Sequence, residues 1–243
     1  MNSNYSISDA LDYMKNLPDN SVNLILTDPP FFVNFKNSIY DDSENNFDEL
    51  VPKYYKEFNR ILVNNGFAVI MVGLKNIHKW IQEGINAGLT YKNIIAVRNF
   101  NNGSPSAKNN FGFQFQPILI FSKGSGRSFN KVDFIPTSKG WYKDKRNKNP
   151  KPYTYSYPNW IKSEWCFATA KNSRKNVHPN EKNVKLLKFF IGLMTDDLDV
   201  VLDPFMGSGS TLEAAKRLNR VYLGCDLNPK CYDITKERLD KIK

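Results

Sequence analysis

The stretch Asp199–Leu218, DVVLDPFMGSGSTLEAAKRL, contains a buried strand, a glycine-rich turn and a helix in immediate succession. Its opening residues, DVVLDPF, form a short apolar run that ends in Asp-Pro, which is typical of a core strand in a parallel sheet. Gly207 and Gly209 allow the backbone to turn tightly and to approach a ligand. Ser210 or Thr211 can then cap the helix that follows. The unit therefore predicts a strand–turn–helix element of an α/β fold.

The same alternation extends outward from this unit in both directions. Apolar runs bounded by turn residues predict further strands at 5–7, 22–28, 66–73, 91–98, 117–121 and 221–227. Apolar residues at helical spacing predict helices at 9–17, 47–62, 76–88, 183–194, 210–218 and from about 230 onward. Asn64-Asn65-Gly66 is interpreted as the stop signal of the second helix. The pattern indicates an α/β fold with a doubly wound, mostly parallel sheet, and 243 residues suit one large domain or a domain with an insertion.

The residues around the glycine-rich turn predict a nucleoside cofactor. Asp226 ends the next strand, 19 residues after Gly207, where an acid can accept hydrogen bonds from ribose hydroxyls. Leu212 occupies the position at which a dinucleotide fingerprint would carry its third glycine, and no Gly-Lys-Ser/Thr phosphate loop occurs here. Asp203 would oppose a pyrophosphate but suits a cationic ammonium or sulfonium group, which favours a sulfonium nucleoside. The alternative is that the glycines only form a tight strand-to-helix turn.

A second strand end carries unusual chemistry. The run 22–28 stops at Asp28 because Pro29 and Pro30 cannot continue a hydrogen-bonded ladder, and Phe31 follows. Asp28 can accept one N–H of an aromatic amine and the Pro29 carbonyl can accept the other, which favours a pyramidal nitrogen with an available lone pair. Phe31 offers a flat face for a base taken out of its stack. The alternative is a plain turn that ends the strand.

The positive charge is confined to one segment. Residues 123–177 contain 13 Lys or Arg and 3 Asp or Glu, whereas the remaining 21 basic residues balance 21 acidic ones. Aromatic residues are interleaved with the basic ones, which favours nucleic acid as the partner over a solvated basic loop. The predicted phosphate contacts are Lys139, Lys143, Lys145, Arg146 and Lys148.

Other features exclude several classes of protein. Cys166, Cys225 and Cys231 are odd in number and lack metal-ligand spacing, which fits a reduced, cytoplasmic protein without a disulfide framework. Two histidines argue against a histidine-rich metal site. No apolar run approaches the roughly 20 residues that span a bilayer, and the N-terminus has no signal-peptide pattern, so no membrane partner is expected.

With these motifs in view, the chain resembles the S-adenosylmethionine-dependent amino-methyltransferases of DNA, which act on adenine N6 or cytosine N4. Asp28-Pro-Pro-Phe31 resembles their catalytic motif, with Phe where Tyr is more usual, and Asp203-Pro-Phe-Met-Gly-Ser-Gly209 resembles their cofactor motif. His178-Pro-Asn-Glu-Lys182 is similar to the motif that braces the methionine end of the cofactor, although a His-Pro turn can also simply cap a helix. Asp9 matches an acid that the family often places near the cofactor adenine, or it caps the helix that it begins.

The candidate site residues can now be collected. The candidate cofactor-binding residues are Asp9, Asp28, His178, Lys182, Asp203, Phe205, Gly207, Gly209, Ser210, Thr211 and Asp226, and the candidate catalytic residues are Asp28, Pro29, Pro30 and Phe31.

The order of the motifs resembles the beta group of this family, in which the catalytic motif precedes the cofactor motif. The resemblance implies a circularly permuted, Rossmann-like sheet of order 3-2-1-4-5-7-6 with the strand near 117–121 antiparallel. It divides the chain into the catalytic half 1–122, an inserted basic target-recognition region 123–177 and the cofactor-binding half 178–243. Gln116 stands where the family usually has a glutamate, which leaves the role of that position open.

The resemblance implies methyl transfer from S-adenosylmethionine to the N6 amine of a flipped adenine in double-stranded DNA, because Asp rather than Ser at position 28 favours adenine. Cytosine N4, an RNA base and a catalytically silent DNA-binding module remain alternatives. Cytosine C5 chemistry is excluded because none of the three cysteines follows a proline. A homodimer and a restriction-enzyme partner remain open.

Overall fold

The computed structural model of the chain describes residues 2–34, 43–98, 115–130, 160–162 and 181–242. Candidate residues outside these ranges are His178 and the basic side chains at Lys139, Lys143, Lys145, Arg146 and Lys148.

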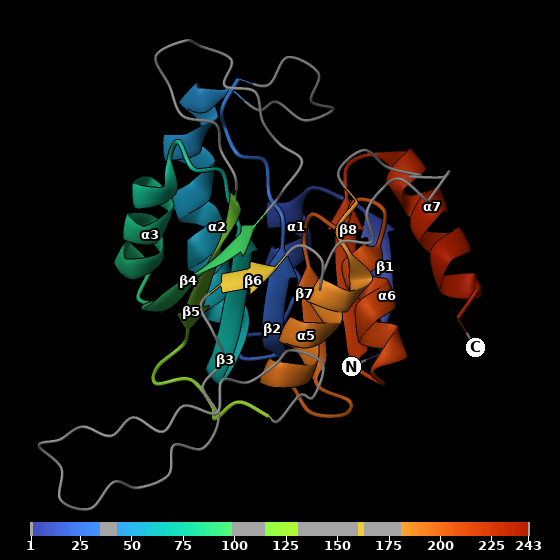
Figure 1. The fold of residues 1–243 in the computed structure, drawn as a ribbon. Helices are drawn as coiled ribbons and strands as arrows, with labels where there is room; N and C mark the ends of the chain where they lie inside the picture. Colours follow the sequence, from blue (N-terminus) through green and yellow to red (C-terminus); the bar gives the residue numbers. More distant parts are fainter. Residues whose placement is uncertain (1, 35–42, 99–114, 131–159, 163–180, 243) are drawn as a thin grey trace, which may run out of the picture.

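The described residues build one eight-stranded sheet of order β1-β8-β7-β2-β3-β5-β4-β6 (Figure 1). Its strands are β1 (Asn4–Ile7), β2 (Val22–Thr27), β3 (Leu62–Met71), β4 (Thr90–Arg98), β5 (Phe115–Ser122), β6 (Trp160–Lys162), β7 (Val200–Asp203) and β8 (Val221–Asp226). β5 runs antiparallel to both of its neighbours, whereas the other described pairs are parallel. If strands are numbered from β7, the cofactor strand of the resemblance, the order from β1 to β4 reads 3-2-1-4-5-7-6. The predicted order and the antiparallel strand are therefore confirmed.

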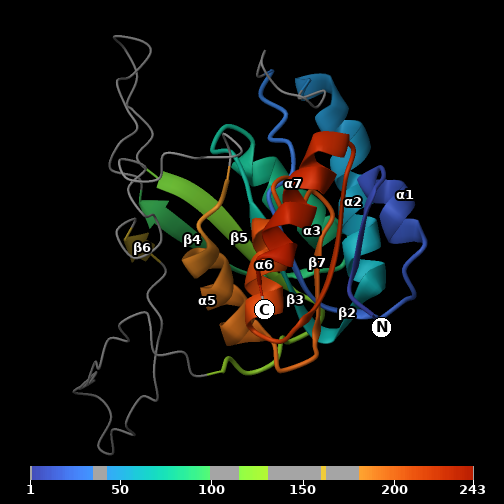
Figure 2. The ribbon, with the colours of Figure 1, turned by 90° about the vertical axis from the view of Figure 1, so that its right-hand side faces the viewer.

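Helices cover both faces of the sheet. They are α1 (Ala10–Lys15), α2 (Phe47–Ile61), α3 (Ile77–Asn86), α5 (Val184–Met194), α6 (Ser210–Arg217) and α7 (Pro229–Asp240), with a short 3-10 turn η1 (Glu44–Asn46) before α2. Figures 1 and 2 show α1, α2 and α3 on one face and α5 and α6 on the other, with α7 beside α6. This arrangement makes the fold doubly wound.

The packing follows from the side-chain periods of the elements. On β2, Ile25 faces the core beneath α1–α3, whereas Leu24 and Leu26 face the core beneath α5 and α6. This alternation is the two-residue period of a strand that is buried on both faces. On α2, buried residues recur every three to four positions, so one stripe of the helix faces the sheet.

One boundary prediction was wrong. Asn64-Asn65-Gly66 does not stop α2, which ends at Ile61, because these residues lie inside β3. They form an irregularity in that strand: the pairing with β2 shifts register beside them, and Asn65 adopts a φ of 65°. Asparagine tolerates this left-handed conformation better than most residues, which explains why a turn-like sequence fits within a strand.

The described parts of the basic segment 123–177, residues 123–130 and 160–162, attach to the core. Arg127 pairs with Asp196 at 2.7 Å and with Asp199 at 3.4 Å, and the Asn130 amide donates to the Thr195 carbonyl at 2.8 Å. Farther along, β6 adds a parallel strand beside β4, which the sequence analysis did not anticipate. The division into three regions remains a prediction, since most of this segment lies outside the described residues.

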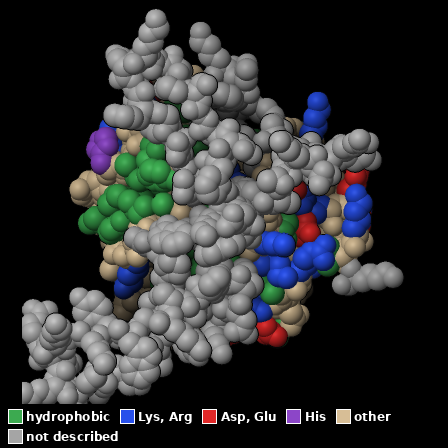
Figure 3. Space-filling view, in the orientation of Figure 1, with side chains coloured by type: hydrophobic (Ala, Val, Ile, Leu, Met, Phe, Trp, Pro, Cys, Tyr) green, Lys and Arg blue, Asp and Glu red, His purple; other side chains and the backbone are tan. Residues whose placement is uncertain are grey.

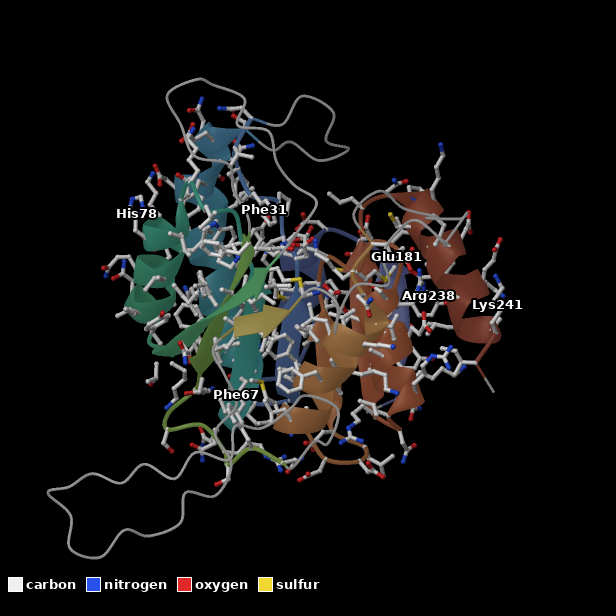
Figure 4. The ribbon with its side chains drawn as sticks, viewed as in Figure 1. Phe31, Phe67, His78, Glu181, Arg238 and Lys241 are labelled. Atoms are coloured by element: carbon white, nitrogen blue, oxygen red, sulfur yellow. The ribbon has the colours of Figure 1, made fainter. Side chains whose placement is uncertain are left out.

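The parallel strands bring the motif residues to one end of the sheet. β1, β8, β7 and β2 are consecutive neighbours and all run the same way, so the loops after them meet at their carboxyl ends. Ligands of open α/β sheets bind at this end. Figure 4 shows Phe31 and Glu181 there and Phe67 toward the opposite end.

In Figure 3, hydrophobic side chains gather below the histidine on the left of the view. Basic side chains gather on the right, over the α5–α7 side. None of the described helices is both long and apolar enough to span a membrane.

Candidate active site

A cavity of about 420 Å³ opens at the carboxyl end of the sheet. This volume lies in the range of roughly 300–1,000 Å³ that small-molecule sites occupy. Its lining combines residues from four strand ends and from α2: Ser8, Asp9, Ala10, Pro30, Phe32, Asn46, Leu50, Tyr54, Pro204, Phe205, Asp226, Leu227, Asn228 and Pro229. The fold thus brings Asp9, Phe205 and Asp226, predicted from separate motifs, to one cavity.

The Asp226 carboxylate joins the two loops that follow β7 and β8. It accepts the Gly207 N–H at 3.0 Å and the Asn228 N–H at 2.9 Å, and the residue is buried. Because backbone donors fix both oxygens, the carboxylate is preorganised at the wall of the cavity. The predicted position of an acid at the end of β8 is confirmed.

Gly207 and Gly209 differ in what surrounds them. Gly207 has a φ of 48°, and a Cβ added there would meet no atom of the described residues within 4 Å. Gly209 has a φ of 75°, and its Cβ would stand 2.6 Å from the Thr235 side chain of α7. The described residues therefore leave open space beside Gly207, whereas Gly209 permits the close approach of α6 and α7.

The predicted cap of α6 was wrong. Gly209 is the N-cap residue, and no side chain among the described residues caps this helix. Ser210 is instead the first residue of the helix, and the Thr211 side chain hydrogen-bonds with Asp203. Serine and threonine are common N-cap residues, which explains the wrong prediction. The left-handed conformation at the start of α6 instead favours glycine at the N-cap position.

Asp203 anchors the ends of β7 and β2 to each other. Its Oδ1 accepts the Thr27 hydroxyl at 2.8 Å and the Phe205 N–H at 3.1 Å, and its side chain is buried. Burial raises the pKa of Asp203 to about 6, while hydrogen bonds from Thr211, Thr27 and Phe205 oppose that rise and the nearby Asp28 charge adds to it. Because Thr27 immediately precedes Asp28, Asp203 fixes the point from which the candidate catalytic residue extends.

The two oxygens of Asp28 have different surroundings. Oδ2 pairs with the Lys182 ammonium at 2.6 Å. Oδ1 is buried and has no hydrogen-bond partner among the described residues. A buried carboxylate oxygen without a hydrogen-bond partner is energetically costly, so this atom is a candidate acceptor for a donor group of a ligand. Lys182 thus contacts the candidate catalytic residue in this structure, and its predicted contact with the cofactor remains a prediction.

The two phenylalanines after the prolines point to different surroundings. The Phe31 side chain is half-buried, lying 3.4 Å from where a Cβ on Gly73 would stand. Phe32 is fully buried, lines the cavity and adopts a φ of 55°, which is rare for a bulky residue. Rings of Phe47 at 5.8 Å and Trp80 at 6.3 Å hold it in place.

Two features of the cavity were missed in the sequence. Tyr54 lies on the buried stripe of α2, so its period predicted only a core residue, yet it lines the cavity and its ring meets Phe205 at 5.2 Å. Burial, with a contribution from the Asp9 charge, raises the pKa of Tyr54. The sequence alone did not distinguish the surroundings of Phe32 from those of Phe31.

Asp9 caps α1, because its side chain accepts the Leu11 N–H at 2.8 Å. The capping interpretation is therefore confirmed, and Asp9 also lines the cavity.

Comparison with known sequences gives one consistent result. A family model described as DNA methylase matches residues 22–237. Type II methyltransferase M.HpaI of Haemophilus parainfluenzae is 28% identical over 96% of this chain and 73% of its own length. M.BamHI of Bacillus amyloliquefaciens is 33% identical over 95% of this chain, which spans about half (55%) of that relative. DNA adenine methyltransferase YhdJ of Escherichia coli is 29% identical over 96% of this chain and 81% of its own length.

Solved structures share the fold. PvuII DNA methyltransferase, titled cytosine-N4-specific, superposes with a TM-score of 0.73 at 20% identity, covering 100% of this chain and 89% of its own. The complex of M1.HpyAVI with SAM gives a TM-score of 0.64 at 23% identity, covering 97% of this chain and 98% of its own.

Proposed function

The chain belongs to the N6/N4 DNA methylase family, and from that premise we propose that it methylates the N6 amine of adenine in double-stranded DNA, with S-adenosylmethionine as the methyl donor. The observation that carries the proposal is the Asp28 carboxylate at the carboxyl end of the sheet. Lys182 holds one of its oxygens, and the other is buried without a hydrogen-bond partner among the described residues. Such an oxygen can accept an N–H of an aromatic amine, whose nitrogen must become pyramidal before it can react.

The residues around the cavity fit a sulfonium nucleoside. The Asp226 carboxylate at the wall can accept ribose hydroxyls beside its two backbone donors, since each carboxylate oxygen has more than one lone pair. The open side of Gly207 lets a ligand approach the backbone closely. The solved complex of M1.HpyAVI with SAM, which has the same fold, also supports this cofactor. When bound, S-adenosylmethionine supplies an electrophilic methyl group.

Residues of the chain would prepare the amine for attack. Asp28 Oδ1 accepts one N–H of the amine and the Pro29 carbonyl accepts the other, so the nitrogen becomes pyramidal and its lone pair leaves the aromatic ring. Both acceptors are fixed before the base arrives, because the consecutive prolines restrict the backbone and Lys182 holds the carboxylate. Phe31 would stack on the flipped base.

Two observations support adenine over cytosine. Position 28 is Asp rather than Ser, and the relative named DNA adenine methyltransferase aligns along 96% of this chain. Cytosine N4 is the second candidate because the PvuII enzyme, titled cytosine-N4-specific, shares the fold. A restriction-enzyme partner, as the Type II names of relatives suggest, a homodimer and a cytoplasmic location remain predictions.

A single-turnover assay with radiolabelled donor, followed by nucleoside analysis, tests the proposal. We expect label in N6-methyladenine of duplex DNA and none in RNA. Asp28→Ala should lower the transfer rate by at least about 100-fold while DNA affinity changes little, because the acceptor matters most as the nitrogen gains positive charge. Label in N4-methylcytosine would overturn the base assignment, and a wild-type rate in Asp28→Ala would overturn the mechanism.

A further inference from the structure

Two sets of ion pairs, joined by the adjacent residues Glu181 and Lys182, connect α7 to Asp28. Arg238, on α7, pairs with Glu181 at 2.6 Å and with Glu213 of α6 at 2.6 Å. Its side chain is only 13% exposed, and those of Glu181 and Glu213 are 24% and 11% exposed. Figure 4 shows Glu181 and Arg238 beside each other on the α7 side of the site.

Glu181 and Lys182 connect these ion pairs of Arg238 to Asp28, the candidate catalytic carboxylate. The two residues are adjacent, yet Glu181 pairs with α7 whereas Lys182 pairs with Asp28 at 2.6 Å. Asn183 then caps α5 by accepting the Lys185 N–H at 2.8 Å. The short segment 181–183 is thus fixed on one side by Arg238, on the other by Asp28 and at its end by α5.

We infer that Glu181 and Arg238 are positioning residues for the proposed methyl transfer, acting through Lys182 to present the free oxygen of Asp28. The inference rests on the proposed function. Lys182 is a flexible side chain, and it can hold Oδ2 in one orientation only if its own backbone is fixed. The unpaired Oδ1 is useful only in that orientation, because a shift of about 1 Å at a reacting group can cost roughly 100-fold in rate.

The structural alternative is that these pairs only stabilise the packing of α7. Buried ion pairs often contribute little net stability, because desolvation offsets the attraction between the charges. The two ion pairs of Arg238 are consistent both with a positioning role and with a purely stabilising role, so a measurement of stability alone does not distinguish the two roles. A measurement of the coupling between Glu181 and Lys182 does distinguish them.

A double-mutant cycle on the transfer rate tests the inference. Glu181→Gln keeps the shape of the side chain and leaves Arg238 paired with Glu213, so the protein should fold. At saturating donor and DNA, we expect its single-turnover rate to fall by roughly 10- to 100-fold. In a Lys182→Met background the same substitution should have no further effect, because its route to Asp28 is already lost. Additive losses, or a wild-type rate in Glu181→Gln, would overturn the inference.

A matched control separates positioning from stability. Arg60 also pairs with two acids, Glu57 at 2.7 Å and Asp19 at 2.5 Å, but on α2 and away from the motifs. Arg60→Met should lower the melting temperature and keep the wild-type rate. Arg238→Met should lower both, and Arg238→Lys should recover only part of the rate because lysine lacks the fork that holds two carboxylates. Equal rates in Arg60→Met and Arg238→Met would contradict the positioning role.

A second readout does not depend on catalysis. The ¹⁵N signal of the Lys182 ammonium, identified by its loss in Lys182→Met, should be visible in the wild-type protein because its ion pair slows hydrogen exchange. Glu181→Gln should broaden that signal. If the wild-type protein transfers no methyl group but Glu181→Gln broadens the Lys182 signal, the proposed function is wrong while the structural coupling of Glu181 to Lys182 is supported. An unchanged Lys182 signal in Glu181→Gln would contradict that coupling.

Discussion

At the scale of single residues, the candidate site depends on differences that a sequence motif does not display. Asp28 pairs one oxygen with Lys182, whereas its other oxygen is buried without a hydrogen-bond partner among the described residues. Gly207 and Gly209 are two residues apart and both have positive φ, yet one borders open space and the other contacts a helix. These differences predict separable effects of neighbouring substitutions.

Alanine at the two glycines should separate cofactor binding from stability. Gly209→Ala should cost roughly 2–5 kcal/mol of unfolding free energy, from the left-handed φ and from collision with Thr235. Gly207→Ala should cost about 1–2 kcal/mol for its φ alone but should weaken S-adenosylmethionine binding, because the new methyl group occupies the open side. Urea denaturation and calorimetric titration measure the two effects. Equal cofactor affinity in Gly207→Ala and wild type would contradict this assignment.

Asp203 should make stability depend on pH. Its pKa rises from 3.8 in the unfolded chain to about 6 in the folded protein, so between these values the folded state binds more protons. Stability therefore falls as the pH rises from about 4 to 6, by roughly 3 kcal/mol from this group, and then levels off. Asp203→Asn keeps an oxygen that can accept from Thr27 and Phe205 but cannot ionise. Its stability relative to wild type, measured by urea denaturation at several pH values, should rise over that interval; a constant difference would contradict the assignment.

At the scale of elements, the turn after β2 is held by the helices beneath it. Phe32 packs between Phe47 of α2 and Trp80 of α3 in a conformation that a bulky residue adopts only when its surroundings impose it. The buried Asn76 amide, just before α3, also donates to the Phe32 carbonyl at 3.3 Å. Phe32 thus fixes the end of the turn, which is consistent with the stacking role proposed for Phe31.

Substitutions of the two phenylalanines should have opposite profiles. Phe32→Ala should cost about 3–5 kcal/mol of stability, because it removes a fully buried ring. Phe31→Ala should cost less stability but weaken capture of the flipped base by roughly 1–3 kcal/mol, whereas Phe31→Tyr should keep activity because the stacking face survives. Denaturation and binding of DNA with a mismatched target base report the two effects. Comparable stability losses at both positions would contradict this division of roles.

At the scale of the whole molecule, the excess positive charge lies in a different part of the sequence from the candidate catalytic and cofactor residues. The described core brings the candidate catalytic and cofactor residues to one end of the sheet, whereas the excess positive charge is confined to residues 123–177. Two described parts of that segment, at Arg127 and at β6, contact the core. These contacts are compatible with a DNA-binding role for the segment.

Removal of charge within the segment should change the salt dependence of DNA binding. Replacing Lys143 and Lys145 with glutamine should reduce the magnitude of the salt slope by roughly 2, because each phosphate contact releases about one counterion. The matched control replaces Lys15 and Lys53, exposed lysines of α1 and α2 that pair with acids on their own helices. The control should leave the slope unchanged. An unchanged slope in the first variant would assign DNA binding to another surface.

The sequence by itself determined the features that depend on local periodicity and on strand ends. Apolar runs predicted every strand of the sheet except β6, whose three residues are too few for a period to be visible. The order of the sheet followed from the resemblance and the permuted motifs, and the site followed because parallel strands end at one edge. Asp28, Asp203 and Asp226 could be selected on this basis.

Tertiary structure alone decided what each of these side chains contacts. The Asn-Asn-Gly irregularity, the glycine cap of α6 and the contribution of Tyr54 to the cavity depend on residues far away in the chain, such as Lys123, Thr235 and Phe205. The ion pairs Arg238–Glu181 and Lys182–Asp28, joined through adjacent residues, connect α7 to the end of β2 in the same way. Local sequence sets backbone preference and hydrophobic period, but hydrogen bonds and ion pairs between distant segments form only once the fold has brought those segments together.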